Sequence, residues 1–216
     1  MNTQKISLIA AALALTVAMP ASAFEAGDWT FKAGITSVDP EQGNGDLAVG
    51  PITVDEDSSL SLTGQYFFSP TLSIELLASL PFEHDYAVVS DGSVAGDAGD
   101  LLVGGSTKHL PPTLSLQYHF NIANNFKPYV GLGLNYTTFF STKAYTGALA
   151  GADVDIDDSF GYALQAGIDY MFTDQLFMNV DLRYIEIESD VKVNGGDVGE
   201  VEINPTTIGL NVGYRF

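Results

Sequence analysis

The sequence predicts an all-β fold, an eight-stranded antiparallel transmembrane β-barrel of the up-and-down type, preceded by a cleaved signal peptide. Three observations predict it: an export signal at the start of the chain, a period-two apolar alternation that recurs eight times, and connections that alternate between short and long. The two expected parts are a signal peptide at residues 1–23 and a barrel domain at residues 24–216.

The first 23 residues have the pattern of a secretory signal. Lys5 supplies the positive charge, residues 6–19 form an apolar run, and Ala21-Ser22-Ala23 fits the small-x-small cleavage pattern. The alternative is a membrane anchor, but the run is shorter than the roughly 18–20 residues that a spanning helix needs. We therefore expect export and a mature chain that starts at Phe24.

The first four strands are expected at residues 29–38, 59–68, 72–80 and 108–120. In each, every second side chain is apolar, and the positions between are polar or small, which places one face in an apolar medium. The apolar faces are, in order, Trp29, Phe31, Ala33 and Ile35; Leu60, Leu62, Tyr66 and Phe68; Leu72, Ile74, Leu76, Ala78 and Leu80; and Leu110, Leu114, Leu116, Tyr118 and Phe120.

The last four strands are expected at residues 127–140, 159–171, 176–187 and 206–216. Their apolar faces are, in order, Val130, Leu132, Leu134 and Tyr136; Phe160, Tyr162, Leu164, Ile168 and Tyr170; Leu176, Met178, Val180, Leu182 and Tyr184; and Ile208, Leu210, Val212, Tyr214 and Phe216. Each segment is close to the 9–11 residues that a tilted strand needs to cross a bilayer. A soluble β-sandwich would also alternate, so the connections decide between the two.

The expected connections alternate in length along the chain. The short ones are residues 69–71, 121–126 and 173–175, and the long ones are residues 39–58, 82–105, 141–158 and 188–205. Bacterial outer-membrane barrels have short periplasmic turns and long outer loops. This pattern predicts a multi-pass barrel in the outer membrane of a Gram-negative bacterium, with both termini in the periplasm.

Aromatic residues gather near the expected strand ends, as in the girdles at membrane interfaces. The chain also ends on Phe216, with Tyr214 two residues before it. A terminal strand that closes in an aromatic residue resembles the signal read by the outer-membrane assembly machinery, which we therefore expect as a partner.

Four segments resemble the OmpW family of outer-membrane proteins. They are KHLPPTLSLQYHF (residues 108–120), KPYVGLGLNYT (127–137), PFEHD (81–85) and GLNVGYRF (209–216). The resemblance implies an eight-stranded barrel with a narrow, largely apolar lumen. It also implies a role in admitting small hydrophobic molecules through the outer membrane.

The inward face of the expected barrel changes character along its axis. The polar floor at the periplasmic end is expected to contain Lys32, Glu75, Asp169 and Arg215. The residues expected to line the lumen and bind ligand are Phe67, Leu77, Pro111, Phe177 and Ile185. An interior that is apolar toward the outside and closed by charges toward the periplasm fits a solute that leaves through the wall. The alternative is a filled, purely structural interior, since eight strands are just wide enough for side chains to fill.

The charge of the chain excludes some partners. It has 27 acidic and 8 basic residues, and 20 of the acids lie in the four long connections, which argues against nucleic acid. We expect contact with outer-membrane lipids and lipopolysaccharide, either through bridging divalent cations or with the acids simply hydrated. There is no cysteine, so no disulfide is possible.

No catalytic site, metal site or cofactor is expected, and the protein is expected not to be an enzyme. Asp153, Asp155 and Asp157 have EF-hand-like spacing, but the required glycine and the final glutamate are absent. His84, Asp85 and Ser90 share one expected loop and could serve an acyltransferase, although closeness in sequence defines no geometry.

The sequence therefore favours a channel or binding protein for the passive uptake of small hydrophobic molecules. Two alternatives stay open: a structural or receptor-like outer-membrane protein with exposed acidic loops, and a narrow cation-preferring pore.

Overall fold

The computed structural model describes residues 24–41, 45–47, 50–90, 92, 99–122 and 125–216. The expected signal peptide, residues 1–23, lies outside the described residues. Within them, no helix is long and apolar enough to cross a membrane.

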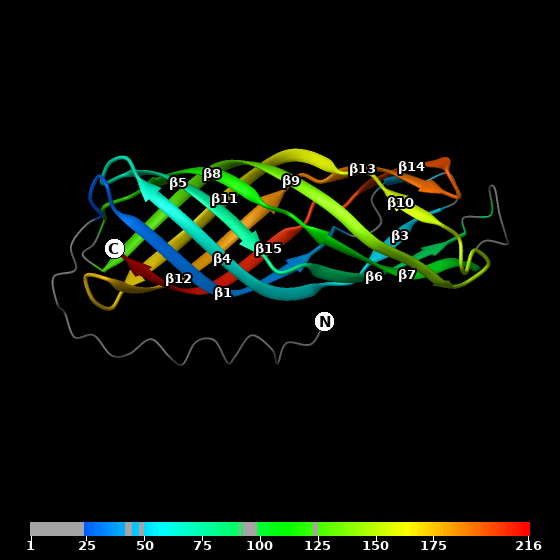
Figure 1. The fold of residues 1–216 in the computed structure, drawn as a ribbon, viewed down its shortest axis with the longest axis horizontal. Helices are drawn as coiled ribbons and strands as arrows, with labels where there is room; N and C mark the ends of the chain where they lie inside the picture. Colours follow the sequence, from blue (N-terminus) through cyan, green and yellow to red (C-terminus); the bar gives the residue numbers. More distant parts are fainter. Residues whose placement is uncertain (1–23, 42–44, 48–49, 91, 93–98, 123–124) are drawn as a thin grey trace.

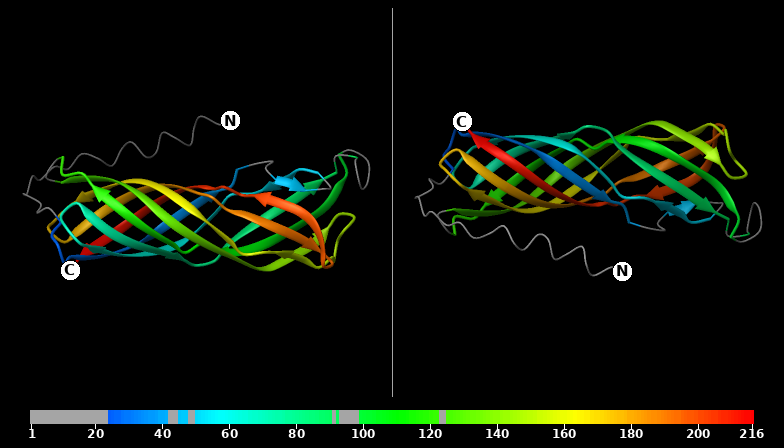
Figure 2. Two further views of the ribbon diagram at one scale, coloured as in Figure 1. Left: turned by 90° about the horizontal axis from the view of Figure 1, so that it is seen from above. Right: turned by 90° about the horizontal axis from the view of Figure 1, so that it is seen from below.

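Eight strands form a closed antiparallel barrel, which confirms the predicted fold class (Figures 1 and 2). Each strand pairs with its neighbour in sequence order, and the first pairs with the last from Thr30 with Arg215 to Asp39 with Thr206. They are β1 (Trp29–Asp39), β4 (Asp57–Phe67), β5 (Leu72–Ser79), β8 (Thr113–His119), β9 (Phe126–Thr146), β11 (Ser159–Met171), β12 (Leu176–Ile185) and β15 (Thr206–Arg215).

The four long connections are not plain loops, and this part of the prediction is wrong. They contain β2 (Gly45–Leu47), β3 (Ile52–Val54), β6 (Phe82–Val89), β7 (Leu101–Leu110), β10 (Val154–Ile156), β13 (Glu188–Val193) and β14 (Gly196–Glu202). Two sheets result, β3–β6–β7–β9 and β10–β13–β14–β2. They prolong the barrel at the end opposite the C-terminus (Figure 1). We call this part the outer extension.

The barrel itself is apolar outside and polar inside. Leu62, Leu132 and Phe160 are more than 60% exposed, whereas inward Thr30, Gln117 and Asn135 are fully buried. Such exposure of large apolar side chains along every strand requires an apolar surrounding medium. The exposed apolar side chains of these barrel strands that lie nearest the outer extension include Ile35, Leu60, Leu114, Tyr136, Phe160 and Ile208.

Aromatic rings encircle the end of the barrel with the short turns. Trp29 contacts Tyr66 with ring centroids 5.0 Å apart, and the pairs Phe126–Tyr170 and Tyr214–Phe216 are similarly close. The backbone N–H of Phe216 donates to the carbonyl of Trp29 at 2.9 Å, which fixes the last residue to the first strand. These contacts match an interfacial girdle at the periplasmic side.

The expected single strand at residues 108–120 is interrupted, which corrects its prediction. β7 ends at Leu110 and β8 begins at Thr113, because Pro111 and Pro112 have no N–H to donate to a ladder. Asn135 instead caps their carbonyls, donating to Pro111 at 3.2 Å and to Pro112 at 3.3 Å. The ladder between β5 and β8 stops at Leu77 and Thr113 and resumes between β6 and β7 at Phe82 and His109.

Candidate solute-binding chamber

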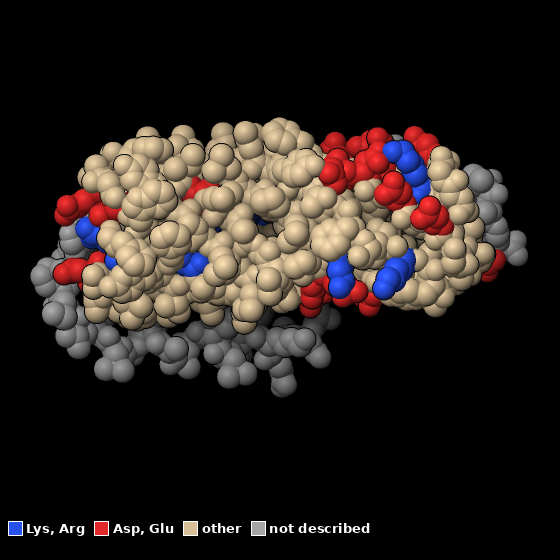
Figure 3. Space-filling model, viewed as in Figure 1, with Lys and Arg blue, Asp and Glu red and all other residues tan. Residues whose placement is uncertain are grey.

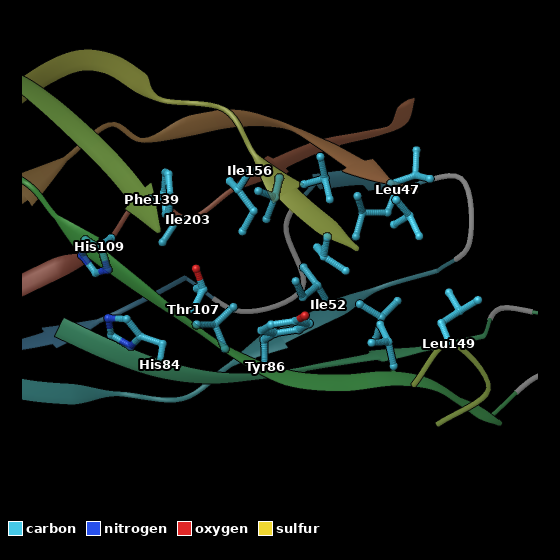
Figure 4. Close-up of a pocket in the computed structure, with 18 residues that line it drawn as sticks. Leu47, Ile52, His84, Tyr86, Thr107, His109, Phe139, Leu149, Ile156 and Ile203 are labelled. Carbon is cyan, nitrogen blue, oxygen red and sulfur yellow. The ribbon is translucent and has the colours of Figure 1, made fainter. Parts of the chain in front are cut away.

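The outer extension encloses a cavity of about 310 Å³ (Figure 4). Its size falls at the lower end of the range for small-molecule sites. Thirteen aliphatic side chains line it: Leu47, Ile52, Val54, Val88, Val103, Leu149, Val154, Ile156, Val191, Val193, Val198, Val201 and Ile203. The remaining lining residues are Tyr86, Phe139, Thr107, His84 and His109. We call this cavity the chamber.

Alternation in the extension builds the chamber wall. On β6, Phe82, His84, Tyr86 and Val88 are buried, while the side chains between them are exposed or half-buried. Apolar side chains therefore point inward here, the reverse of the barrel below. Acidic side chains gather on the outside of the extension, whereas the barrel between its two ends shows few charges (Figure 3).

Aromatic rings form the inner floor of the chamber. The rings of His84 and His109 stack with centroids 4.9 Å apart, and His109 lies 5.4 Å from Phe82 and 5.8 Å from Phe139. We call these four residues the ring layer. The ring layer lies at the inner end of the outer extension. Burial lowers the pKa of His109 to about 3; the neighbouring His84 lowers it further, and Asp57 opposes the shift. His109 is therefore neutral at ordinary pH.

The tautomer of His84 follows from its one hydrogen bond. Its Nδ1 lies 2.6 Å from the carbonyl oxygen of Asp55, and a carbonyl only accepts, so Nδ1 carries the proton. Its Nε2 is then an acceptor, and it is buried with no hydrogen-bond partner among the described residues. Leaving a buried acceptor unpaired is costly.

Below the ring layer is a second, much smaller void. Its volume is about 10 Å³, the space of roughly one water molecule. Three residues expected to line the lumen, Leu77, Pro111 and Ile185, line this void together with Phe82. The sequence thus located the apolar stretch of the interior, but the larger cavity lies further out.

A hydrogen-bonded network of charges fills the barrel under the small void. Glu75 forms an ion pair with Lys32 and accepts from Arg183 Nη2 at 2.6 Å. Arg183 Nε also donates to Asp181 at 2.6 Å, and the Tyr129 hydroxyl donates to Asp181 at 2.8 Å. All of these side chains are less than 10% exposed. We call this set the charge network, and it blocks a straight path along the axis.

The sequence identified part of this network. Lys32, Glu75 and Asp169 are buried in it, and Asn179 joins Asp169 to Tyr129 through bonds of 2.8 and 2.9 Å. Arg215 lies nearer the periplasmic rim, where its Nε donates to Asp28 at 2.8 Å. Arg183 and Asp181 were missed, although their inward-facing positions on the last-but-one barrel strand could have indicated them.

Phe67 and Phe177, which we expected to line the lumen and bind ligand, lie at the periplasmic end and not in the chamber. They pack with Phe24 and Met171 into a fully buried cluster at the periplasmic end. Phe24 stacks on Phe67 with centroids 4.2 Å apart and so fills the space between the strands. The cluster is a second closure below the charge network.

The acyltransferase alternative is also excluded by geometry. His84 faces the chamber, whereas Asp85 is exposed on the opposite face of β6 and accepts from the Tyr145 hydroxyl at 3.0 Å. Neighbouring residues on a strand point to opposite faces, so the two cannot form a catalytic pair. Among the described residues, no group of three or more histidine or acidic side chains could hold a metal ion.

A closed barrel with an apolar belt, aromatic girdle and inward charges defines an outer-membrane β-barrel protein of a Gram-negative bacterium. The sequence is 40% identical to outer membrane protein W of Vibrio cholerae, over 95% of this chain and 96% of that protein. The OmpW family model matches residues 25–216. The chain belongs to the OmpW family.

Two solved structures are similar over nearly their whole length. The crystal structure of the outer membrane protein OprG from Pseudomonas aeruginosa has a TM-score of 0.73 and 32% identity, covering 89% of this chain and 97% of that one. The solid-state NMR structure of outer membrane protein AlkL in lipid bilayers has a TM-score of 0.66 and 25% identity, covering 94% and 96%. Both likenesses extend over the barrel and much of the outer extension.

Proposed function

We propose that this protein takes up small hydrophobic compounds from the outside through the chamber and releases them sideways into the membrane. The observation that carries the proposal is the pairing of an apolar chamber with a blocked barrel. A solute can gain burial in the chamber, at roughly 25 cal/mol per Å² of apolar surface. It cannot continue through the charge network without separating buried ion pairs.

The break in the wall supports a sideways exit. Between the β5–β8 and β6–β7 ladders, residues 78–81 and 110–112 form no ladder with each other. Leu77, Pro111 and Phe82 surround the small void at this height, just above the lipid-facing band. A short movement of Phe82 and the proline segment would join the chamber to the lipid.

Matched substitutions on β6 test the proposal. Val88 lines the chamber, and its half-buried neighbour Val89 does not. We expect Val88→Asp to abolish binding of the apolar fluorophore N-phenyl-1-naphthylamine to the protein in nanodiscs, with Val89→Asp unchanged. Cells that oxidise dodecane at the inner membrane should lose dodecane uptake with Val88→Asp alone. Equal behaviour of the two variants in both assays would contradict the proposal.

Contact with lipopolysaccharide and with the assembly machinery, the latter through Tyr214 and Phe216, remains part of this proposal. The absence of enzymatic activity stays a prediction.

Planar-bilayer conductance separates uptake from the cation-pore alternative, since the charge network should leave the wild-type protein almost non-conducting.

A further inference from the structure

The polar atoms of the chamber gather at its inner end. His84, His109 and Thr107 lie there, and the part near Leu47 and Leu149 is aliphatic, while the Tyr86 hydroxyl between them donates to the carbonyl of Lys143 at 3.1 Å (Figure 4). The chamber is thus an amphipathic cavity, although the proposed function asks only for an apolar one.

The two histidines have unused hydrogen-bonding capacity. Both are only 3% exposed, and His84 Nε2 is an acceptor with no partner among the described residues. The His109 side chain contacts three rings of the layer and lines the chamber. As a neutral imidazole it offers one N–H donor and one acceptor nitrogen.

Packing does not require nitrogen at these two positions. The same layer contains Phe82 and Phe139, which stack on the histidines as apolar rings do. Phenylalanine would fill the space without burying unpaired polar atoms. The unpaired Nε2 of His84 therefore needs a partner that the described part of the chain does not supply.

We propose that His84 and His109 form a subsite for a terminal hydroxyl group, so that the chamber prefers single-chain alcohols to alkanes of the same length. The inference rests on the proposed function, since the alkyl chain would occupy the aliphatic part. The hydroxyl donates to a lone-pair nitrogen and accepts from the His109 N–H. Ligands with only an acceptor, such as methyl ethers, satisfy half of the subsite.

A ligand series measures the subsite in the wild-type protein. Decane, decyl methyl ether, 1-decanol and decanoic acid compete with N-phenyl-1-naphthylamine for the protein in nanodiscs, after correction for partition into empty nanodiscs. We expect 1-decanol to bind about tenfold more tightly than decane, with the ether between them, because two buried hydrogen bonds at the lower end of their net contribution together give about that factor. Decanoic acid is ionised at neutral pH and offers only acceptor oxygens, so it should bind less tightly than 1-decanol.

Two ring variants provide the control. His109→Phe keeps a ring in the layer but removes the two nitrogens of His109, and should lower the alcohol preference from about tenfold to about threefold, because His84 Nε2 can still accept from the hydroxyl. Phe139→Leu alters the same layer without removing a nitrogen and should change decane and decanol affinities by the same factor.

The outcomes separate the two proposals. If decane and 1-decanol bind equally to the wild type, the subsite is refuted and hydrophobic uptake stands. If neither displaces the fluorophore, the proposed function is refuted as well. If His109→Phe retains the full alcohol preference, the assignment to this histidine pair is overturned.

Discussion

The charge network allows a quantitative test through Glu75→Gln. Glu75 is fully buried and is the salt-bridge partner of Lys32, whereas Arg183 also pairs with Asp181. The substitution therefore removes the direct salt-bridge partner of the buried cation Lys32 and leaves only Asp169 and Asp181 to offset its charge. Removing one partner of a buried pair costs about 3–5 kcal/mol.

We expect a loss of about 3 kcal/mol for this variant, the lower end, because the glutamine oxygen still accepts a hydrogen bond. That loss corresponds to a change on the order of 100-fold in the unfolding equilibrium. Lys32→Met should cost less than Glu75→Gln, since Glu75 keeps Arg183 as a partner. The double variant should be more stable than the sum of the two single losses predicts.

Urea unfolding in lipid vesicles measures these losses through the single tryptophan, Trp29, which lies in the periplasmic girdle. The matched control is Asp157→Asn, which removes the partner of Lys192 in an ion pair whose side chains are 37% and 42% exposed. That surface change should cost less than about 1 kcal/mol. Equal losses for Glu75→Gln and Asp157→Asn, or strict additivity in the double variant, would refute the reasoning.

Three further predictions follow from other parts of the interior. Gly213→Ala should lower the free energy of unfolding by about 1–3 kcal/mol, because a Cβ there would lie 2.2 Å from the Phe177 ring. The same urea titration measures this loss, and an unchanged unfolding midpoint would contradict the prediction. Burial lowers the pKa of His109 to about 3, so between pH 6.5 and 3 the unfolded chain binds more protons at this residue than the folded chain does. The contribution of His109 to the free energy of unfolding should therefore be constant above this window and should fall as the pH drops through it. His109→Phe should flatten that slope, and an equal slope in both proteins would assign the effect elsewhere. The double variant Arg183→Ala, Lys32→Met should raise the conductance in planar bilayers, because it removes both cations of the charge network. If the double variant shows no conductance, the closure lies at the cluster of Phe24, Phe67, Met171 and Phe177 instead.

The barrel strands could be predicted because lipid enforces a simple contrast. Each spanning segment presents apolar side chains to the membrane and polar ones inward, so the period-two pattern marks both the strand and its faces. The segment at 159–171 was predicted with the bounds that the structure shows. Inward placement of Lys32, Glu75 and Asp169 followed from the same pattern.

The chamber could not be predicted because the pattern reverses in the outer extension. On β13, Glu188, Asp190 and Lys192 alternate with Ser189, Val191 and Val193, which resembles a soluble hairpin with its charges in water. Such segments are short, separated by glycines and rich in acids, so they resemble hydrated loops. Only pairing between distant connections, such as β14 with β2, turns their small apolar faces into one cavity.

This reversal of polarity has a physical consequence for the exit route. At one height the wall changes from apolar-outside to apolar-inside. Near this height the ladder is interrupted at Pro111 and Pro112, and β9 has a positive φ of 56° at Ser141. The weakest part of the wall therefore lies where the inner apolar surface of the chamber ends and the outer apolar surface of the barrel begins. A hydrophobic solute that crosses the wall at this height leaves one apolar surface directly for the other, which supports the sideways route over any path through the charge network.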